Sequence, residues 1–285
     1  MKRVSPAPYT ADLHAHSTCS DGALSPTALV SLARRRGVRH LALTDHDTMA
    51  GFAEAQAAGN KLGVQIIPAV ELSVRHTPRE PGGDPRELHL LGYFIDPHHR
   101  ALSECMCDRR SDRERRVRAI CARLAELGVP VEVQAVLASA PGNVGRPHVA
   151  RALLNAGHVK TIDEAFTRFL GDGRPAYVAN DGPSVEEGIA LIHAAGGVTA
   201  LAHPGIEGAD ADLPGLTSAG LDGLECAHPS HSGEATRRYR ALAGSLGLVA
   251  TGGSDFHRAE GGAAPGRHGV EPLIIARLHE RRRLL

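Results

Sequence analysis

Residues 12–22 read DLHAHSTCSDG, and this stretch sets the interpretation of the rest of the chain. The pattern predicts a short strand that ends near Leu13. His14 and His16 are two residues apart at the end of that strand, so both imidazoles are expected on one face. Asp21 follows in the next loop. Two imidazoles and a nearby carboxylate are donor types that bind transition-metal ions.

Similar donors follow the later strands that the sequence predicts, which end near Thr44, Val70, Tyr93, Ala202, Cys226 and Thr251. Most of the donors fall at the carboxyl ends of these strands, the face where catalytic groups gather in α/β barrels. His89 stands at the start of its strand, which would have to run in the opposite direction. The predicted metal ligands are His14, His16, Asp21, His46, Glu71, His89, His203, Asp255 and His257, with His228 beside them.

The order of predicted elements indicates an α/β fold. Strands alternate with helices, as in parallel βαβ units. Ser25 and Pro26 have the pattern of a helix start and Gly37 that of its end, and residues 51–62 and 234–246 also read as helices. Seven strands favour a barrel over an open sheet. Residues 105–175 read as an α-helical insertion with loops at 139–147 and 171–175, and residues 77–86 as a turn-rich link between two adjacent strands.

Composition excludes several classes of protein. The chain has 285 residues with 32 basic and 32 acidic side chains, so its formal net charge is zero and it lacks the overall basic character of a nucleic-acid-binding domain. No run of about 20 apolar residues predicts a membrane helix, and the N-terminus does not resemble a secretory signal. The five cysteines form no CxxC pair, which favours a reducing cytoplasm.

Eight other histidines and two aspartates are candidates for ordinary structural roles. A lone histidine is usually a surface or packing residue, and we expect this of His40, His76, His98, His99, His158, His193, His268 and His279. Asp45 and Asp47 flank His46. For each of them, orientation of a ligand imidazole and an ordinary turn or cap role are equally favoured.

The ordered motifs DLHAHSTCSDG, TDHD, AVELS, AHP and GSDFH resemble those of the PHP (polymerase and histidinol phosphatase) family over residues 12–257. The resemblance implies a distorted seven-stranded (β/α) barrel with a trinuclear metal site. The helical pattern of the insertion places the barrel in residues 1–104 and 176–285, and the donor types suit manganese, zinc or iron. The resemblance implies one ion held by His14, His16, Glu71 and Asp255, a second by Glu71, His89 and His203, and a third by Asp21, His46 and His257. Some members have His where Asp21 stands, and many have Gly where Ala69 stands.

A narrower resemblance lies in NVGRPHVARAL, inside the predicted insertion. It is similar to a segment of a bacterial subgroup that contains nucleoside 3',5'-bisphosphate phosphatases and 5'-3' exoribonucleases. The resemblance implies that Arg146 and His148 contact the substrate phosphate, and an Arg fork suits phosphate oxygens. Without it, Pro147 in a helix start with a solvated Arg146 would be the favoured interpretation.

The metal set predicts hydrolysis of a phosphate ester by attack of a metal-bridging hydroxide, with Arg146 and the third ion offsetting charge on the phosphoryl oxygens. His228 or His148 could protonate the leaving oxygen. The leading substrate is a small nucleotide. A 5'-3' exonuclease acting on short RNA or DNA ends, a phosphatase of small metabolites such as histidinol phosphate, and a non-catalytic metal-binding module are the alternatives.

The segment DRRSDRERRVR, residues 108–118, has six arginines and three acids. Such a run usually forms a solvated helix face with i,i+4 ion pairs. A strip that follows a nucleic-acid backbone is the alternative. Few aromatic side chains are present to stack on single-stranded bases, although Tyr177 could stack one, and this scarcity favours a small substrate.

Overall fold

The computed structural model describes residues 7–78, 85–258 and 263–284. Seven strands lie side by side in sequence order, β1 to β7. Their bounds are β1 (Ala11–Asp12), β2 (His40–Leu43), β3 (Gln65–His76), β4 (Arg86–Tyr93), β5 (Val198–Leu201), β6 (Gly223–Ala227) and β7 (Val249–Gly252).

Hydrogen bonds bring the two outer strands together. The amide of Leu13, just after β1, donates to the carbonyl of Gly252 at 3.3 Å, and the amide of Asp255 donates to the carbonyl of His14 at 2.8 Å. The sheet is therefore nearly closed into a barrel, and the predicted α/β barrel class is confirmed. The short β1 leaves the closure incomplete, which fits the expected distortion.

The strand that carries His89, β4, runs in the opposite direction to its neighbours, as the position of His89 required. β3 and β4 pair antiparallel, and so do β4 and β5, whereas the other neighbours are parallel. β3 does not end near Val70 but continues to His76, because β4 pairs along its second half with Ser73 opposite His89. Glu71 therefore lies inside β3 and not at its end. Of the predicted link at 77–86, residues 79–84 lie outside the described residues.

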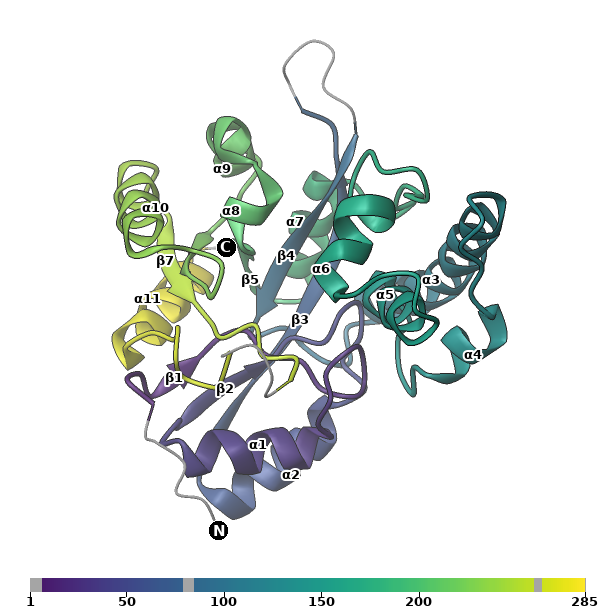
Figure 1. Cartoon of the computed structure of the whole chain (residues 1–285). Coiled ribbons are helices and arrows are strands. Elements are labelled where there is room, and N and C mark those ends of the chain that lie inside the picture. The colour runs from purple at the N-terminus through teal and green to yellow at the C-terminus, as the bar shows by residue number, and fades with distance from the viewer. Residues whose placement is uncertain (1–6, 79–84, 259–262, 285) are drawn as a thin grey trace.

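Helices cover the strands on several sides (Figure 1). α1 and α2 lie together beside β1 and β2, and α10 and α11 lie near β7. The bounds of the barrel helices are α1 (Pro26–Arg35), α2 (Phe52–Leu62), α7 (Val185–Ala194), α8 (Pro204–Glu207), α9 (Leu213–Ser218), α10 (Gly233–Ser245) and α11 (Pro272–Arg282). The predicted start of α1 is confirmed, since Ser25 caps it through the Ala28 amide and Pro26 is its first residue. Gly37 follows its end with a φ of 90°.

Four further helices lie between β4 and α7, at one side of the barrel (Figure 1). They are α3 (Arg100–Glu126), α4 (Val133–Ala138), α5 (Arg146–Asn155) and α6 (Ile162–Ala165), the last continued by a π-helical turn at Phe166–Leu170. These helices share an apolar cluster that includes Val117, Leu124, Val149 and Leu153. The division of the chain into a barrel and a separate insertion of residues 105–175 stays a prediction.

The arginine-rich run, residues 108–118, lies on α3. Neither a solvated helix face nor a strip along a nucleic-acid backbone describes all of it. Arg110, Arg115 and Arg118 are exposed, as on a solvated face. Arg109, Arg113 and Arg116, spaced one turn apart, point inward, and Arg109 is only 4% exposed. Arg113 and Arg116 hold α3 against the barrel through Asp47 and Glu87, whereas Arg109 pairs with Asp112 on α3 itself.

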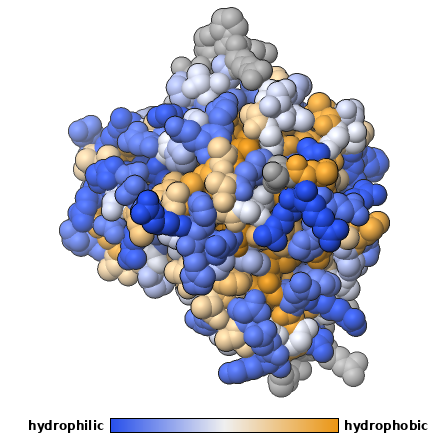
Figure 2. Space-filling view, turned by 180° about the vertical axis from the view of Figure 1, so that it is seen from behind, coloured by the Kyte–Doolittle hydropathy of each residue, from blue (hydrophilic) through white to orange (hydrophobic). Residues whose placement is uncertain are grey.

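Length and apolar composition together decide whether a helix can span a membrane. None of the helices in the described part of the chain combines the length and the apolar composition that crossing a bilayer requires. Figure 2 shows a mostly hydrophilic rim around a band of hydrophobic side chains on the rear face.

Barrel closure depends on Gly253, where a Cβ would lie 2.2 Å from the Cβ of His14. Gly253→Ala should force β7 away from β1 and destabilise the protein by about 1–3 kcal/mol, the usual cost of overpacking. Thermal unfolding measures this. Gly244→Ala is the matched control, because a Cβ there meets nothing within 4 Å and alanine favours the α10 helix. Equal melting temperatures for the two variants would contradict the close approach.

Candidate metal centre

The nine predicted metal ligands lie together at one end of the barrel. Four overlapping groups have donor atoms within 4.8 Å of one another: His14, His16 and Asp255; His14, Glu71 and His203; His46, Glu71 and His89; and His16, Asp21, His46 and His257. The residues come from β3, β4 and the segments that follow β1, β2, β5 and β7. Residues up to 243 positions apart in the sequence, His14 and His257, thus line one site.

Glu71 stands at the centre of this cluster and is fully buried. Its Oε2 lies 3.2 Å from Nε2 of both His14 and His16. Its Oε1 lies 3.0 Å from Nδ1 of His89 and 3.0 Å from Nε2 of His203. Nδ1 of His46 also lies 3.2 Å from Oε2. The two oxygens of one carboxylate therefore face different imidazoles, three at Oε2 and two at Oε1.

The first group has the spacing of a metal coordination shell. The Nε2 atoms of His14 and His16 lie 3.1 Å apart, and Oδ1 of Asp255 lies 3.3 Å from the first and 3.1 Å from the second. A tetrahedral ion with bonds of about 2.0–2.1 Å has ligand atoms about 3.3 Å apart. The donor set therefore fits a divalent transition-metal ion.

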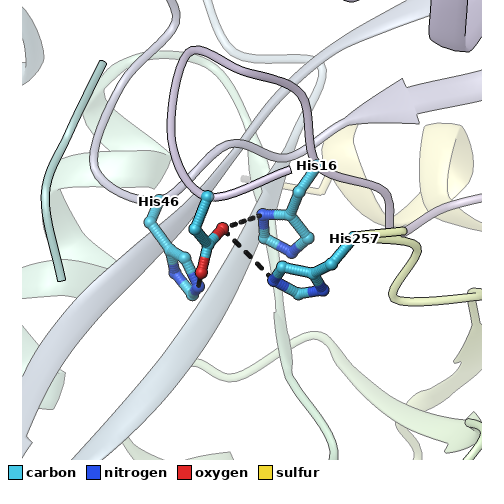
Figure 3. Close-up of side chains that lie close together, drawn as sticks. His16, His46 and His257 are labelled. Atoms are coloured by element: carbon cyan, nitrogen blue, oxygen red, sulfur yellow. Dashed lines mark ion pairs between the residues drawn. The ribbon is translucent and has the colours of Figure 1, made fainter. Parts of the chain in front are cut away.

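Three imidazoles surround one carboxylate in the outer part of the cluster (Figure 3). The carboxylate is that of Asp21, with Oδ1 3.2 Å from Nε2 of His257 and 3.7 Å from Nδ1 of His16, and Oδ2 3.6 Å from Nε2 of His46. The contacts to His16 and His46 are longer than those around Glu71. The group is also more open, since the side chain of His257 is 27% exposed.

The charges of the cluster shift its pKa values strongly. Burial acts to raise the pKa of Glu71, but the imidazoles of His46, His14 and His89 outweigh it and hold that pKa well below its usual value. Burial lowers the pKa of His46 to about 3, against the carboxylates of Glu71 and Asp21. For His257, burial is outweighed by Asp21 and Asp255, which raise its pKa to about 10. A cation binding beside His257 would have to displace a proton.

Strained backbone accompanies the ligands. Only four residues other than glycine in the described ranges have a positive φ, and they include His203 at 25° and Asp255 at 46°. Asp47, next to His46, is a third, at 52°. Such conformations cost about 1–3 kcal/mol each and cluster at functional sites. The surrounding hydrogen bonds must hold these turns in place.

Two carboxylates that the sequence analysis did not single out orient the imidazoles. Glu225 is fully buried on β6, with Oε1 3.0 Å from Nδ1 of His14, and its Oε2 accepts the amide of His203 at 2.9 Å. Oε1 of Glu87 lies 3.2 Å from Nε2 of His89. Carboxylates of this kind fix the tautomer and the direction of a ligand histidine.

The sequence contains a feature that could have identified each of these two carboxylates. Glu225 is the one charged side chain of the buried strand GLECA, where an unpaired charge would be costly. Glu87 is two residues from His89 on β4 and so shares its face.

Asp45 and Asp47 contact loop and helix residues and do not orient a ligand imidazole, which was one of the two roles considered for them. Asp45 accepts hydrogen bonds from the amide and hydroxyl of Ser17 and from the hydroxyl of Ser20, all at 2.7 Å. Asp47 accepts the amide of Ser73 at 2.8 Å and Nε of Arg113 at 2.6 Å. They fix the loops around His46, and Asp47 also attaches α3 to β3.

The three predicted substrate-binding residues are not in one place. His228 lies beside the cluster, with Nε2 3.1 Å from Oδ2 of Asp255 and Nδ1 2.7 Å from the hydroxyl of Ser230. Arg146 and His148, although two residues apart at the start of α5, line different cavities. Their contact with a substrate phosphate therefore stays a prediction.

Histidines expected outside the site are found outside it. His193 lies 2.7 Å from Asp222, His76 faces Asp212 at 3.2 Å, and His99 caps α3 through the Leu102 amide. None of the eight belongs to the four groups of donors found among the described residues.

The fold and the cluster define an α/β barrel hydrolase whose site is built for divalent metal ions. The family model of the PHP domain matches residues 12–164. Two relatives are each 36% identical to this chain: a 5'-3' exoribonuclease of Haemophilus influenzae, aligned over 86% of this chain and 89% of the relative, and a 3',5'-nucleoside bisphosphate phosphatase of Chromobacterium violaceum, over 90% and 88%.

A solved structure agrees with this relationship along nearly the whole chain. A proposed metal-dependent phosphoesterase from Bifidobacterium adolescentis is 30% identical, with a TM-score of 0.85 over 97% of this chain and 98% of its own. The chain therefore belongs to the PHP family of metal-dependent phosphoesterases, and the resemblance seen in its motifs is confirmed.

Loss of the Glu225 carboxylate should weaken metal binding. In Glu225→Gln the side-chain amide can donate to Nδ1 of His14, which would move the imidazole proton to the nitrogen that faces Glu71. Loss of such an orienting partner typically costs about 10–100-fold in metal affinity. Competition with a chelator measures it. Glu234→Gln, on the exposed side of α10, is the control and should bind metal as the wild type does. Unchanged affinity in Glu225→Gln would contradict the orienting role.

Proposed function

We propose that this protein is a metal-dependent phosphoesterase that removes phosphate from small nucleotides, with a nucleoside 3',5'-bisphosphate as its leading substrate. The observation that carries the proposal is the division of the Glu71 carboxylate between two sets of imidazoles, three at Oε2 and two at Oε1, all at 3.0–3.2 Å. Such a carboxylate suits two ions held side by side. The name of the Chromobacterium relative supports the substrate class.

Two or three ions would be held in this arrangement. His14, His16, Glu71 and Asp255 would hold one ion, and Glu71, His89 and His203 would hold a second. Asp21, His46 and His257 would hold the third ion. Imidazoles and carboxylates without a thiolate suit manganese, zinc or iron in a catalytic site.

When bound, such ions supply Lewis-acid polarisation of phosphoryl oxygens and a nucleophile derived from water at neutral pH. The chain itself orients the substrate and moves a proton. His228 is the proposed proton donor to the leaving oxygen, because its Nε2 borders Asp255 while its Nδ1 is held by Ser230.

Arg146 and His148 are proposed to contact the substrate from opposite sides of the α5 start. Arg146 borders a cavity that also contains His89 and His203. His148 accepts the amide of Gly145 at Nδ1, at 3.2 Å, so its Nε2–H is available for a phosphate oxygen.

A second candidate function is trimming of RNA from its 5' end. The Haemophilus relative is named a 5'-3' exoribonuclease, and water attack on phosphorus serves both reactions. Action on histidinol phosphate and a purely non-catalytic role lack comparable support. A cytoplasmic location remains a prediction. A panel of nucleoside bisphosphates, mononucleotides, short oligonucleotides and histidinol phosphate on the metal-replete protein tests the proposal, and no hydrolysis of any of them would contradict it.

Replacing the central carboxylate should cost more than replacing an outer ligand. Glu71→Ala removes a donor from two proposed ions, whereas His257→Ala removes one from a single, more open group. We therefore expect Glu71→Ala to lose more bound metal and more kcat than His257→Ala. Elemental analysis and steady-state kinetics on both variants decide it. Wild-type turnover in Glu71→Ala would rule out the bridging role.

The leaving group should reveal the role of His228. His228→Asn is expected to lower kcat by about 10²–10⁴-fold on nucleotides, the usual worth of a general acid. Its effect on p-nitrophenyl phosphate should be much smaller, since that phenolate leaves without a proton. Metal content is measured in parallel to confirm that the cluster is intact. Equal losses on both substrates would contradict proton donation by His228.

A further inference from the structure

Two cavities border the metal cluster on different sides. The first, which we call the Arg146 cavity, has a volume of about 450 Å³ and contains Arg86, Glu87, His89, Arg146, Asp172 and His203 in its walls. The second, the Arg151 cavity, has a volume of about 260 Å³ and contains Ser20, Asp21, Pro147, His148, Arg151 and Arg258. Each shares at least one wall residue with the cluster, so each could receive a part of the substrate.

The positive charges of the Arg146 cavity are already neutralised. Nη2 of Arg146 lies 3.1 Å from Oε1 of Glu87, and its Nη1 lies 2.9 Å from Oδ1 of Asp172. Arg86 forms an ion pair with Asp212. Glu87 is also bound by Arg116. A phosphate entering this cavity would meet Glu87 and Asp172 together with the arginines, so the cavity offers little net attraction to a dianion.

The Arg151 cavity has the opposite balance. Arg151 and Arg258 are both partly buried, and neither forms an ion pair with any residue in the described ranges. The one acid in the wall, Asp21, faces His257 and His46. Within the described ranges, neither guanidinium group is therefore paired with a carboxylate. Guanidinium forks bind phosphate oxygens in a bidentate manner.

We propose that the Arg151 cavity binds a second, terminal phosphate of the nucleotide whose other phosphate reacts at the metal cluster. The inference rests on the proposed function and makes it more specific. A nucleoside 3',5'-bisphosphate and a 5'-phosphorylated RNA end both carry such a phosphate one nucleoside away from the reacting one. A simple mononucleotide does not.

The test compares substrates with and without the second phosphate on the full, metal-replete chain. The ratio of kcat/KM for adenosine 3',5'-bisphosphate to that for adenosine 3'-phosphate measures the contribution of the cavity. Arg151→Gln and Arg258→Gln should each lower this ratio by about 10- to 150-fold, the typical worth of one charge-assisted contact. Arg118→Gln, on the exposed face of α3, is the matched control and should leave it unchanged.

A second comparison separates the two sources of the phosphate. A 5'-phosphorylated dinucleotide is measured against its unphosphorylated form with the same variants. A reduced preference for the phosphorylated dinucleotide as well as for the bisphosphate supports a cavity that also receives RNA ends. A reduced preference for the bisphosphate alone supports a cavity that receives nucleoside bisphosphates and not RNA ends.

A binding measurement makes the test independent of turnover. Calorimetric titration with adenosine 5'-phosphate should show weaker affinity in Arg151→Gln and Arg258→Gln than in the wild type, with melting temperatures unchanged. The inference is overturned if both variants keep the wild-type ratio and affinity, or if Arg146→Gln lowers them in their place. Wild-type protein that hydrolyses no phosphoester would instead contradict the proposed function, while the titration would still test the cavity.

Discussion

The buried charge of Glu71 is the constraint on which the rest of the site depends. A carboxylate with no exposure to solvent is costly unless cations or hydrogen-bond donors surround it. Here imidazoles from β4 and from the segments after β1, β2 and β5 converge on its two oxygens at 3.0–3.2 Å. Any rearrangement of the barrel that separated these strands would leave the charge uncompensated.

The barrel meets this requirement by combining both strand directions. The parallel strands bring their carboxyl ends to one side of the molecule. β4 runs against its neighbours, so His89 reaches the same site from the middle of a strand and faces Glu71. Closure between β1 and β7 then brings Asp255 to His14 and His16. Positive φ angles at His203 and Asp255 show that the backbone is bent to aim these side chains.

Much of this arrangement could be predicted from the sequence, because ligand-type residues beside successive strands are rarely coincidental. The α/β barrel followed from the number of strands and their alternation with helices, and the start of α1 followed from its capping residues. The length of β3 could not be predicted in this way, since it depends on pairing with β4, a tertiary interaction. The separation of Arg146 from His148 depends on how α5 packs, which their spacing of two residues does not determine.

The arginine-rich helix illustrates the same limit. Three of its six arginines are exposed and three are buried or half-buried, because α3 has one face against the barrel and one against solvent. Arg113 and Arg116 bind Asp47 and Glu87, two acids close in sequence to His46 and His89. The helical segment is thereby tied to the loops and strands that hold the ligands, a coupling that only the three-dimensional structure makes visible.

Titration of metal-stripped protein with manganese tests the central claim most directly, when bound equivalents and hydrolysis of adenosine 3',5'-bisphosphate are followed in the same sample. If Glu71 joins two ions, activity should be nearly absent at one equivalent per chain and should rise as the second binds. Full activity in the protein after exhaustive chelation, with no bound metal, would contradict the account.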